Sequence, residues 1–391
     1  MLSRLVPFVV CVVPALALGG PALAAGSKTS VAPSPLTWDV GLRGQYTVDS
    51  TGGHYETILA PDANIDMSQF GGDSAVSASA QVHYDDTGSF GIDSADLSAK
   101  GSGNLDPDTV LSQSLDLNLV QLKATDPSLP PNTVAGPLEF TGTLDGSATH
   151  RFWDFDGTAD LGLKRFVEGP TTLSGGTTID DTSKSYWQAS GGLRAGYEFV
   201  PNASVFVEGD VAYQKYDAVD PTLLVYLDGA TTSLRAGLSY DDKGTISAEA
   251  STGPAWRVYT DGSVADRMGW LYDGSFSFTP DDHLTLGAGL TTTLVPSDLT
   301  PGDTDILTDI NANASIAMGA GLKLRGTADW NQETAIGSHA SSNGYSYGAG
   351  LDFVPAPGTT WSADYLFTHS FTPPGPAQDS QAVTLGVKIS G

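Results

Sequence analysis

Charged side chains recur at alternate positions of several long segments, and they are the residues of this sequence best suited to act on ions. Carboxylates attract cations and guanidinium or ammonium groups attract anions, so rings of such side chains can select the ions that pass a pore. A spacing of two places them on one face of an extended chain. The candidates for one water-facing surface are Arg43, Arg194, Glu208, Asp210, Arg235, Glu249, Arg257, Asp305, Asp309, Lys323, Arg325, Asp329, Asp352, Asp364 and Lys388.

Motifs for bond-breaking chemistry are weak, and we predict no catalytic residue, no metal site and no cofactor. The histidines are scattered and never form a His-Glu-x-x-His zinc motif; they are His54, His83, His150, His283, His339 and His369. Residues 72–75, Gly-Asp-Ser-Ala, resemble an esterase nucleophile block, which needs a strand-to-helix turn and a later histidine. Residues 281–283, Asp-Asp-His, are interpreted as a turn instead. The acidic groups at 85–86 and 106–108 are also interpreted as turns, with cation binding as the alternative.

The segment 186–216 shows which elements must position the charged residues. Its first half places Trp187, Leu193, Tyr197 and other apolar residues at every second position, and polar residues or glycine between them. Residues 200–203, Val-Pro-Asn-Ala, form a turn, and the return half alternates in the same way. Each arm exceeds the usual length of a soluble strand. Long strands with one apolar and one polar face are typical of a transmembrane β-barrel.

The same alternation extends over most of the chain. In 284–294, for example, Leu284, Leu286, Leu290 and Leu294 are predicted to face lipid. Connections alternate between short ones, such as 241–244, and long ones, such as 217–229, as they do in outer-membrane barrels. We predict an all-β, antiparallel up-and-down barrel of eighteen strands over 36–391, with sixteen as the alternative and both termini periplasmic. A soluble β-sandwich or solenoid array is the other fold considered.

Aromatic residues concentrate at the predicted strand ends, where barrels carry girdles at the membrane interfaces. Three turns share the form ring–x–proline, as in 353–355, Phe-Val-Pro. The predicted interface aromatics are Trp38, Trp187, Tyr197, Phe199, Tyr213, Trp256, Phe276, Phe278, Trp330, Tyr345, Phe353, Trp361 and Tyr365.

The first 25 residues have the pattern of a secretory signal peptide, and 26–35 of a short periplasmic linker. Cys11 is the only cysteine, so the exported chain has no disulfide. Cleavage removes one arginine and no acid, which makes the formal net charge of −27 one unit more negative. Such acidity excludes general binding of nucleic acid. The expected partners are outer-membrane lipid and lipopolysaccharide, small solutes or glycans, and an unidentified protein of the envelope machinery.

Residues 193–216, from Leu-Arg-Ala-Gly-Tyr-Glu-Phe-Val-Pro-Asn to Tyr-Gln-Lys-Tyr, resemble the putative beta-barrel porin-2 family of Gram-negative bacteria. The runs 234–259 and 345–365 fit it as well, so the resemblance covers about 185–391 well and the first half loosely. It implies a multi-pass barrel of the cell outer membrane, near surface-polysaccharide systems. The chain ends Lys388-Ile389-Ser390-Gly391, whereas such barrels commonly end on an aromatic that aids insertion.

These patterns predict a porin-like conduit for small hydrophilic solutes or exopolysaccharide, with no enzymatic step and with a preference for cations. One alternative is an assembly barrel with a filled lumen that anchors an envelope complex. The least favoured is an outer-membrane lipid or glycan hydrolase. An inward loop that forms a constriction would favour the conduit, and complete salt-bridge pairing across the lumen would favour the anchor. A serine and a histidine that meet near the outer interface would favour the hydrolase.

Overall fold

The computed structural model describes residues 36–49, 52–68, 72–86, 88–124, 129–130, 132–372 and 375–391, so the predicted signal peptide and linker lie outside the described residues. Eighteen long strands form one sheet. They are β1 (Leu36–Asp49), β2 (Gly52–Asp66), β3 (Asp73–Asp85), β4 (Phe90–Asp106), β5 (Thr109–Gln121), β7 (Leu138–Phe152), β8 (Phe155–Glu168), β11 (Tyr186–Val200), β12 (Ala203–Tyr216), β13 (Gly229–Asp241), β14 (Ile246–Tyr259), β15 (Arg267–Asp281), β16 (Leu284–Pro296), β17 (Thr304–Gly319), β18 (Leu322–Ala335), β19 (Ser341–Ala356), β20 (Thr359–Phe371) and β21 (Gln378–Ser390).

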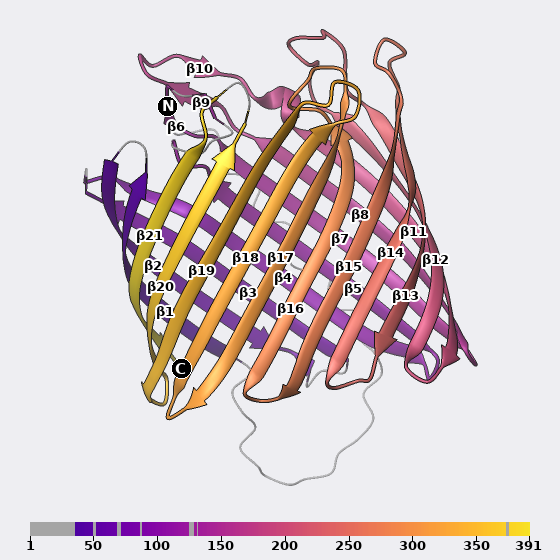
Figure 1. Ribbon diagram of the computed structural model, residues 1–391, viewed down its shortest axis with the longest axis horizontal. Coiled ribbons are helices and arrows are strands. Elements are labelled where there is room, and N and C mark those ends of the chain that lie inside the picture. The colour runs from indigo at the N-terminus through magenta and orange to yellow at the C-terminus, as the bar shows by residue number, and fades with distance from the viewer. Residues whose placement is uncertain are drawn as a thin grey trace.

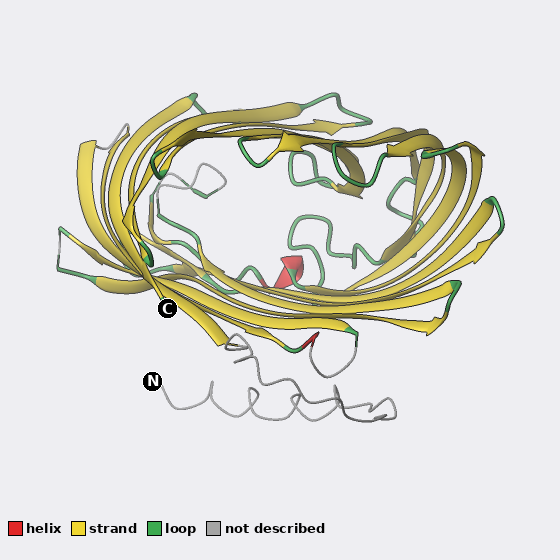
Figure 2. Cartoon of the chain, turned by 90° about the horizontal axis from the view of Figure 1, so that it is seen from below, coloured by secondary structure: helices red, strands yellow, loops and turns green. Residues whose placement is uncertain are grey.

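The sheet closes into a barrel because the first and last strands pair. Each strand is antiparallel to its neighbour in sequence, and β1 also pairs with β21, with Leu42 opposite Val387. Closure satisfies the backbone hydrogen bonds of every strand, which a lipid environment requires. Strongly tilted strands enclose a wide interior (Figure 1), and the cross-section is oval (Figure 2). The predicted eighteen-stranded barrel is confirmed. None of the described helices has the length and apolar character needed to cross a bilayer.

From β4 onward, short turns gather at one end of the barrel and longer connections at the other (Figure 1). The short turns carry residues suited to tight reversal: Asn202 and Lys243 have φ values of 69° and 61°. In the turn after β13 the backbone N–H groups of Ile246 and Thr245 donate to Asp242, and these hydrogen bonds lower the pKa of that carboxyl. Both β1 and β21 have their terminal ends at the short-turn rim, where Trp38 N donates to Gly391 O.

Two of the long connections, between β5 and β7 and between β8 and β11, contain secondary structure. Strands β6 (Thr133–Ala135), β9 (Thr171–Leu173) and β10 (Thr178–Ile179) form a separate small sheet at the long-connection end, followed by the 3-10 helix η2 (Thr182–Lys184). Viewed along the barrel, this helix and neighbouring loops project inside the outline of the wall (Figure 2). The long connections therefore narrow the mouth at this end.

The wall folds inward near the long-connection end of β16. Pairing of β15 with β16 stops at Gly274 and Leu290, and beyond it Thr292 Oγ1 bonds to Tyr272 N and O. Leu294 is then buried with Ala255 and Leu271, with Ile306 and Ile336 packed against them. The prediction that Leu294 faces lipid is therefore wrong. A side-chain alternation of two holds only while strands stay in one layer, and here β16 leaves its neighbour.

Gly253 marks a close approach of two backbones within the wall. The pairing of β13 with β14 is interrupted opposite Gly253 and Pro254, as expected where proline cannot donate to a ladder. A Cβ at Gly253 would lie 2.0 Å from Leu234 O. We expect Gly253→Ala to lower the free energy of unfolding by about 2 kcal/mol through this overpacking. Urea titration in detergent micelles measures it, and Gly274→Ala, 3.5 Å from Glu249 O, is the control that should change little.

Candidate functional site: the lumen wall

The strand register determines which side chains share the inner face. In β11 and β12, Arg194 lies opposite Glu208, and Glu208 lies opposite Arg235 of β13. The alternate positions carry Leu193, Val207 and Leu234, whose exposed fractions are 69%, 54% and 57%. Large apolar side chains facing outward suit lipid, while the polar face encloses the lumen. Most of the charges singled out from the sequence lie on this inner face.

Two arginines organise the charged inner face of β11–β15, which we call the arginine cluster: Arg194, Glu208, Asp210, Arg235, Glu249 and Asp273. Arg194 binds Glu249 through both guanidinium Nη atoms, at 2.8 and 2.7 Å. Arg235 contacts Glu208 at 2.9 Å, Asp210 at 3.1 Å, and Asp273. Bidentate pairs of this kind combine strength with fixed geometry. Asp273 was not predicted, although it alternates with the rings of β15.

The buried ring of Phe206 packs against Arg194 of the arginine cluster. Phe206 is 3% exposed, and the Arg194 guanidinium carbon lies 3.5 Å from its ring centroid. A Cβ at Gly237 on the next strand would lie 2.3 Å from this ring. Glycine at 237 therefore leaves room for Phe206, which in turn holds Arg194 by a cation–π contact.

The remaining predicted charges divide between paired and unpaired groups. Arg325 binds Asp352 at 2.7 and 2.9 Å and Asp364 at 2.7 Å, and Lys388 binds Asp39 at 3.0 Å. Asp329 accepts a hydrogen bond from Ser346. No ion pair is found for the rest in the part of the chain that the structure describes; these residues are Arg43, Arg257, Asp305, Asp309 and Lys323.

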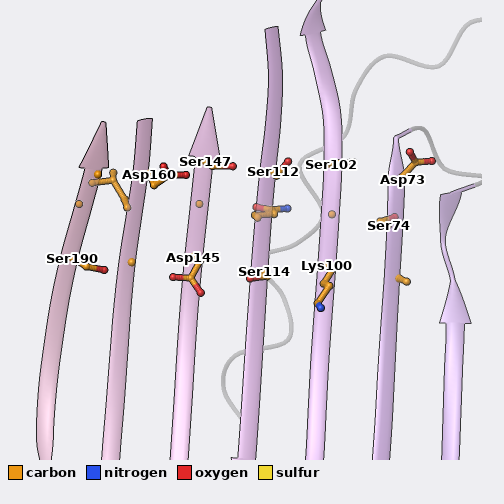
Figure 3. Close-up of a pocket in the computed structure, with 18 of the residues that line it drawn as sticks. Asp73, Ser74, Lys100, Ser102, Ser112, Ser114, Asp145, Ser147, Asp160 and Ser190 are labelled. Atoms are coloured by element: carbon orange, nitrogen blue, oxygen red, sulfur yellow. The ribbon is translucent and has the colours of Figure 1, made fainter. Parts of the chain in front are cut away.

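The inner face of β3–β11 has a different chemistry. A cavity of about 1110 Å³ is lined there by small polar side chains (Figure 3). We call this surface the serine–aspartate wall: Asp73, Lys100, Ser102, Ser112, Ser114, Asp145, Ser147, Asp160 and Ser190. Sequence reasoning missed all of these residues as a site. The available signal was the alternation in 143–149, where Thr, Asp, Ser and Thr are separated by Leu, Gly and Ala.

Two rows run across the serine–aspartate wall in the direction of the strand hydrogen bonds. One row joins Asp73, Ser102, Ser112, Ser147 and Asp160 as successive cross-strand partners. The second joins Lys100, Ser114 and Asp145, and continues through Gly162 to Ser190. Because barrel strands are tilted, such rows climb the wall diagonally. The first begins near the short-turn end of β3 and reaches the middle of the barrel.

Charges on the serine–aspartate wall lack partners. Within the described ranges, Asp73, Lys100, Asp145 and Asp160 make no ion pair. The three aspartates outnumber the one lysine, and hydroxyl groups separate them. This surface can therefore bind cations and hydroxyl groups from solution, whereas Arg194 and Arg235 of the adjoining arginine cluster already bind carboxylates.

Buried polar contacts tie the long connections to the rim. Arg257 is 1% exposed, donates to Thr231 Oγ1 and Leu227 O, and lies over the ring of Tyr259. Tyr259 OH contacts Thr304 Oγ1 at 2.9 Å. Asp303 accepts from Arg267 Nε and from the backbone N–H groups of Thr304, Gly337 and Ser338. Burial opposes ionisation of Asp303, but these donors outweigh it and lower the pKa of its carboxyl.

The predicted interface aromatics lie on the outer face. Eleven of the thirteen are exposed, and Phe278 and Trp330 are half-buried. Strand pairing places Trp330 opposite Tyr345 and Phe353 opposite Trp361. Tyr197 packs against Phe155, at 4.8 Å between ring centroids, near the short-turn rim. Phe155 was not predicted, since the first half of the sequence shows fewer such pairs.

Neither weak catalytic motif assembles into a site among the described residues. Ser74 lies in strand β3 and is followed by strand, not by the helix that the esterase motif needs. His283 donates its backbone N–H to Asp281 in a short turn. Asp106 likewise accepts from Asp108 N and Thr109 Oγ1 in a turn. No set of three or more histidine, cysteine, aspartate or glutamate side chains in the described ranges is placed to hold one metal ion.

The sequence matches a known protein family. The model of the family described as "Putative beta-barrel porin 2" matches residues 47–390. No curated protein matches the sequence. Similar solved structures include three from Pseudomonas aeruginosa. OccK3 (OpdO) has 12% identity and a TM-score of 0.42, covering 91% of this chain and 96% of its own.

The second structure, OpdK with vanillate, has 11% identity and a TM-score of 0.43, covering 91% and 99% of the two chains. The third, a mutant of the ferric enterobactin receptor PfeA in complex with enterobactin, has 9% identity and a TM-score of 0.46, covering 93% and 82%. The family match spans nearly all of the barrel that the strands form. The chain belongs to the putative beta-barrel porin 2 family and is an outer-membrane β-barrel, a porin-like conduit for small solutes.

Proposed function

We propose that the barrel conducts small hydrophilic solutes that carry positive charge and hydroxyl groups, along the serine–aspartate wall and without breaking a bond. The observation that carries this proposal is the contrast between the unpaired acids of the serine–aspartate wall and the paired arginines elsewhere on the inner face. The acids Asp73, Asp145 and Asp160 have no ion-pair partner in the described chain, whereas Arg194, Arg235 and Arg325 all bind carboxylates. Unpaired acids attract cations, and serine hydroxyls can exchange hydrogen bonds with a polyol.

The pattern of ion pairs favours an open conduit over a filled, anchoring barrel. The pairs found on the inner face join strands that are three or fewer apart around the wall, as Arg194 of β11 does with Glu249 of β14. They rigidify one stretch of the wall and leave the cavity beside the serine–aspartate wall open. A conduit of this kind selects by size and by the field of its lining charges.

The first test is single-channel recording of the refolded mature protein in a planar bilayer under a salt gradient. We expect stable current steps and a reversal potential directed by the cation. Liposome swelling then compares glucosamine, N-acetylglucosamine and glucuronate, which have similar sizes but positive, neutral and negative charge. Glucosamine should enter fastest. Current carried mainly by anions, or fastest entry of glucuronate, would contradict the proposal.

Removal of two unpaired acids tests the wall itself. Asp145→Asn combined with Asp160→Asn should reduce the cation-to-anion permeability ratio by about two- to fivefold, because both charges face the lumen. The matched control, Asp242→Asn with Asp281→Asn, removes the same charge from short turns where asparagine can keep the capping hydrogen bonds. Equal ratios in the two double variants would show that the wall does not set selectivity.

A further inference from the structure

Asp305 is a buried carboxylate without a hydrogen-bond donor. It is the second residue of β17, at the long-connection end of the barrel, and its exposed fraction is 0%. Neither of its carboxylate oxygens has a hydrogen-bond partner among the described residues. Burying an ionised carboxylate without a partner costs several kcal/mol. Something that supplies positive charge is therefore needed at this position.

A second acid lies on the same face of the sheet, because Glu333 pairs with Leu307, two residues along β17 from Asp305. The side chain of Glu333 on β18 lies within hydrogen-bonding range of Asp305. Glu333 Oε2 accepts one hydrogen bond from Ser342 Oγ, at 3.2 Å. Two ionised carboxylates are both acceptors, so they attract each other only through a positive species between them. Glu333 therefore links Asp305 of β17 with Ser342 of β19 through oxygen atoms only.

The surroundings add negative charge. Asp298 acts electrostatically on both Asp305 and Glu333. The lysine that acts on Asp298, Lys184, is itself bound to Glu168 at 3.0 Å. No arginine, lysine or histidine of the described chain forms an ion pair with Asp305 or Glu333. Carboxylate and hydroxyl oxygens without nitrogen or sulfur are the ligands preferred by hard divalent cations.

We propose that a divalent cation of the calcium class binds between Asp305 and Glu333, where it joins the long-connection ends of β17 and β18. The two carboxylates and the Ser342 hydroxyl contact the ion, and Asp298 contributes its charge from nearby. Because no third acidic side chain among the described residues is placed to share the ion, water completes the six to eight oxygen ligands that calcium takes. The ion neutralises an otherwise repulsive pair at the rim of the lumen.

Calorimetric titration of Ca²⁺ into the refolded mature protein, freed of metal with EDTA, tests this site. We expect one saturable site per chain with a Kd on the order of 10⁻⁴ M, as in calcium sites with few protein ligands, and a Ca²⁺-dependent rise in the unfolding temperature. Asp305→Asn and Glu333→Gln should each weaken binding at least tenfold. Both should also stabilise the metal-free protein, because each removes one of the two repelling charges.

Asp329→Asn is the matched control, since it removes another inner-face acid of β18 whose partner is Ser346. It should bind Ca²⁺ as the wild type does. Heat-modifiable migration in gels establishes that each variant is folded, and Glu333→Gln serves if Asp305→Asn fails to fold. Wild type without a saturable site, or equal Ca²⁺ binding by Asp305→Asn, would overturn the proposal. Proton uptake by the pair without Ca²⁺ binding would also overturn it, by showing that a shared proton holds the carboxyls together.

Discussion

Arg235→Ala is expected to destabilise the barrel more than removal of any other inner-face charge. The guanidinium contacts Glu208 and Asp210 of β12 and Asp273 of β15, and its side chain is 19% exposed. Its loss leaves Asp210 and Asp273 without an ion-pair partner among the described residues, and leaves Glu208 with only Arg194, 3.9 Å away. Breaking a largely buried pair costs about 3 kcal/mol, and urea unfolding in micelles should show a loss of this size. Relative cation permeability should increase in the same variant.

Three comparisons make the result for Arg235 interpretable. Arg43→Ala removes an inner-face arginine for which no ion pair is found in the described chain, and it should change stability little. Arg235→Lys keeps the charge but lacks the planar fork, so an intermediate loss is expected. Adding Glu208→Gln to Arg235→Ala should recover part of the lost stability by relieving repulsion. An Arg235→Ala barrel as stable as Arg43→Ala would show that water already compensates these acids.

The sequence was most informative where strand faces differ strongly in chemistry. In β11–β21, rings alternate with charges, and the predicted inner-face set includes Arg194, Glu208 and Arg235, which do meet. In β3–β8 the outer face carries small residues such as Ala78, Gly101 and Gly146. The two faces then differ little in size, so Asp145 and Asp160 did not stand out as a site.

The ion-pair partner of each charged residue and the irregular places in the sheet could not be predicted from the alternation of side chains alone. A side-chain period of two assigns each residue to a face of the sheet. The partner of a charged residue depends also on the strand register, and β-bulges shift the register. One such shift lies between Gln81 and Val82 in the pairing of β3 with β4. The burial of Leu294 depends on where β16 leaves β15. The Asp305–Glu333 contact requires β17 and β18 to be in register near the long connections, where loop lengths vary most.

Asp303→Asn is expected to release two long connections from the rim. Asp303 is 5% exposed and joins Arg267 to the loop 336–340 through four donors, two of them the N–H groups of Gly337 and Ser338 at 2.8 Å. An amide keeps one acceptor and loses the charge that pairs with Arg267. Hydrogen bonds to a charged group contribute about 1.5 to 3 kcal/mol each. Limited proteolysis of the intact barrel should therefore cut within 297–303 and 336–340 at least tenfold faster.

The pH dependence of that protection follows from the lowered pKa of Asp303 in the folded barrel. A carboxyl whose pKa is lowered by folding stabilises the folded state. This stabilisation is fully present at pH values above the pKa of the carboxyl in the unfolded chain, about 3.9. The stabilisation is lost as pH falls through the folded value, so the wild-type loops should resist proteolysis at neutral pH and open only below about pH 4. An acid-active protease such as pepsin measures this range, and Asp303→Asn should show no corresponding transition.

The control is Asp261→Asn, another long-connection aspartate, whose carboxylate binds only Ser263 N and Oγ of its own loop among the described contacts. Its loss should leave cleavage at 297–303 and 336–340 unchanged, because it joins no second segment to the rim. If Asp303→Asn instead resisted proteolysis like Asp261→Asn at neutral pH, the loops would be held by the apolar cluster of Leu294 and Ile336 rather than by the carboxylate. Truncation of Ile336 to alanine would then accelerate cleavage where Asp303→Asn does not.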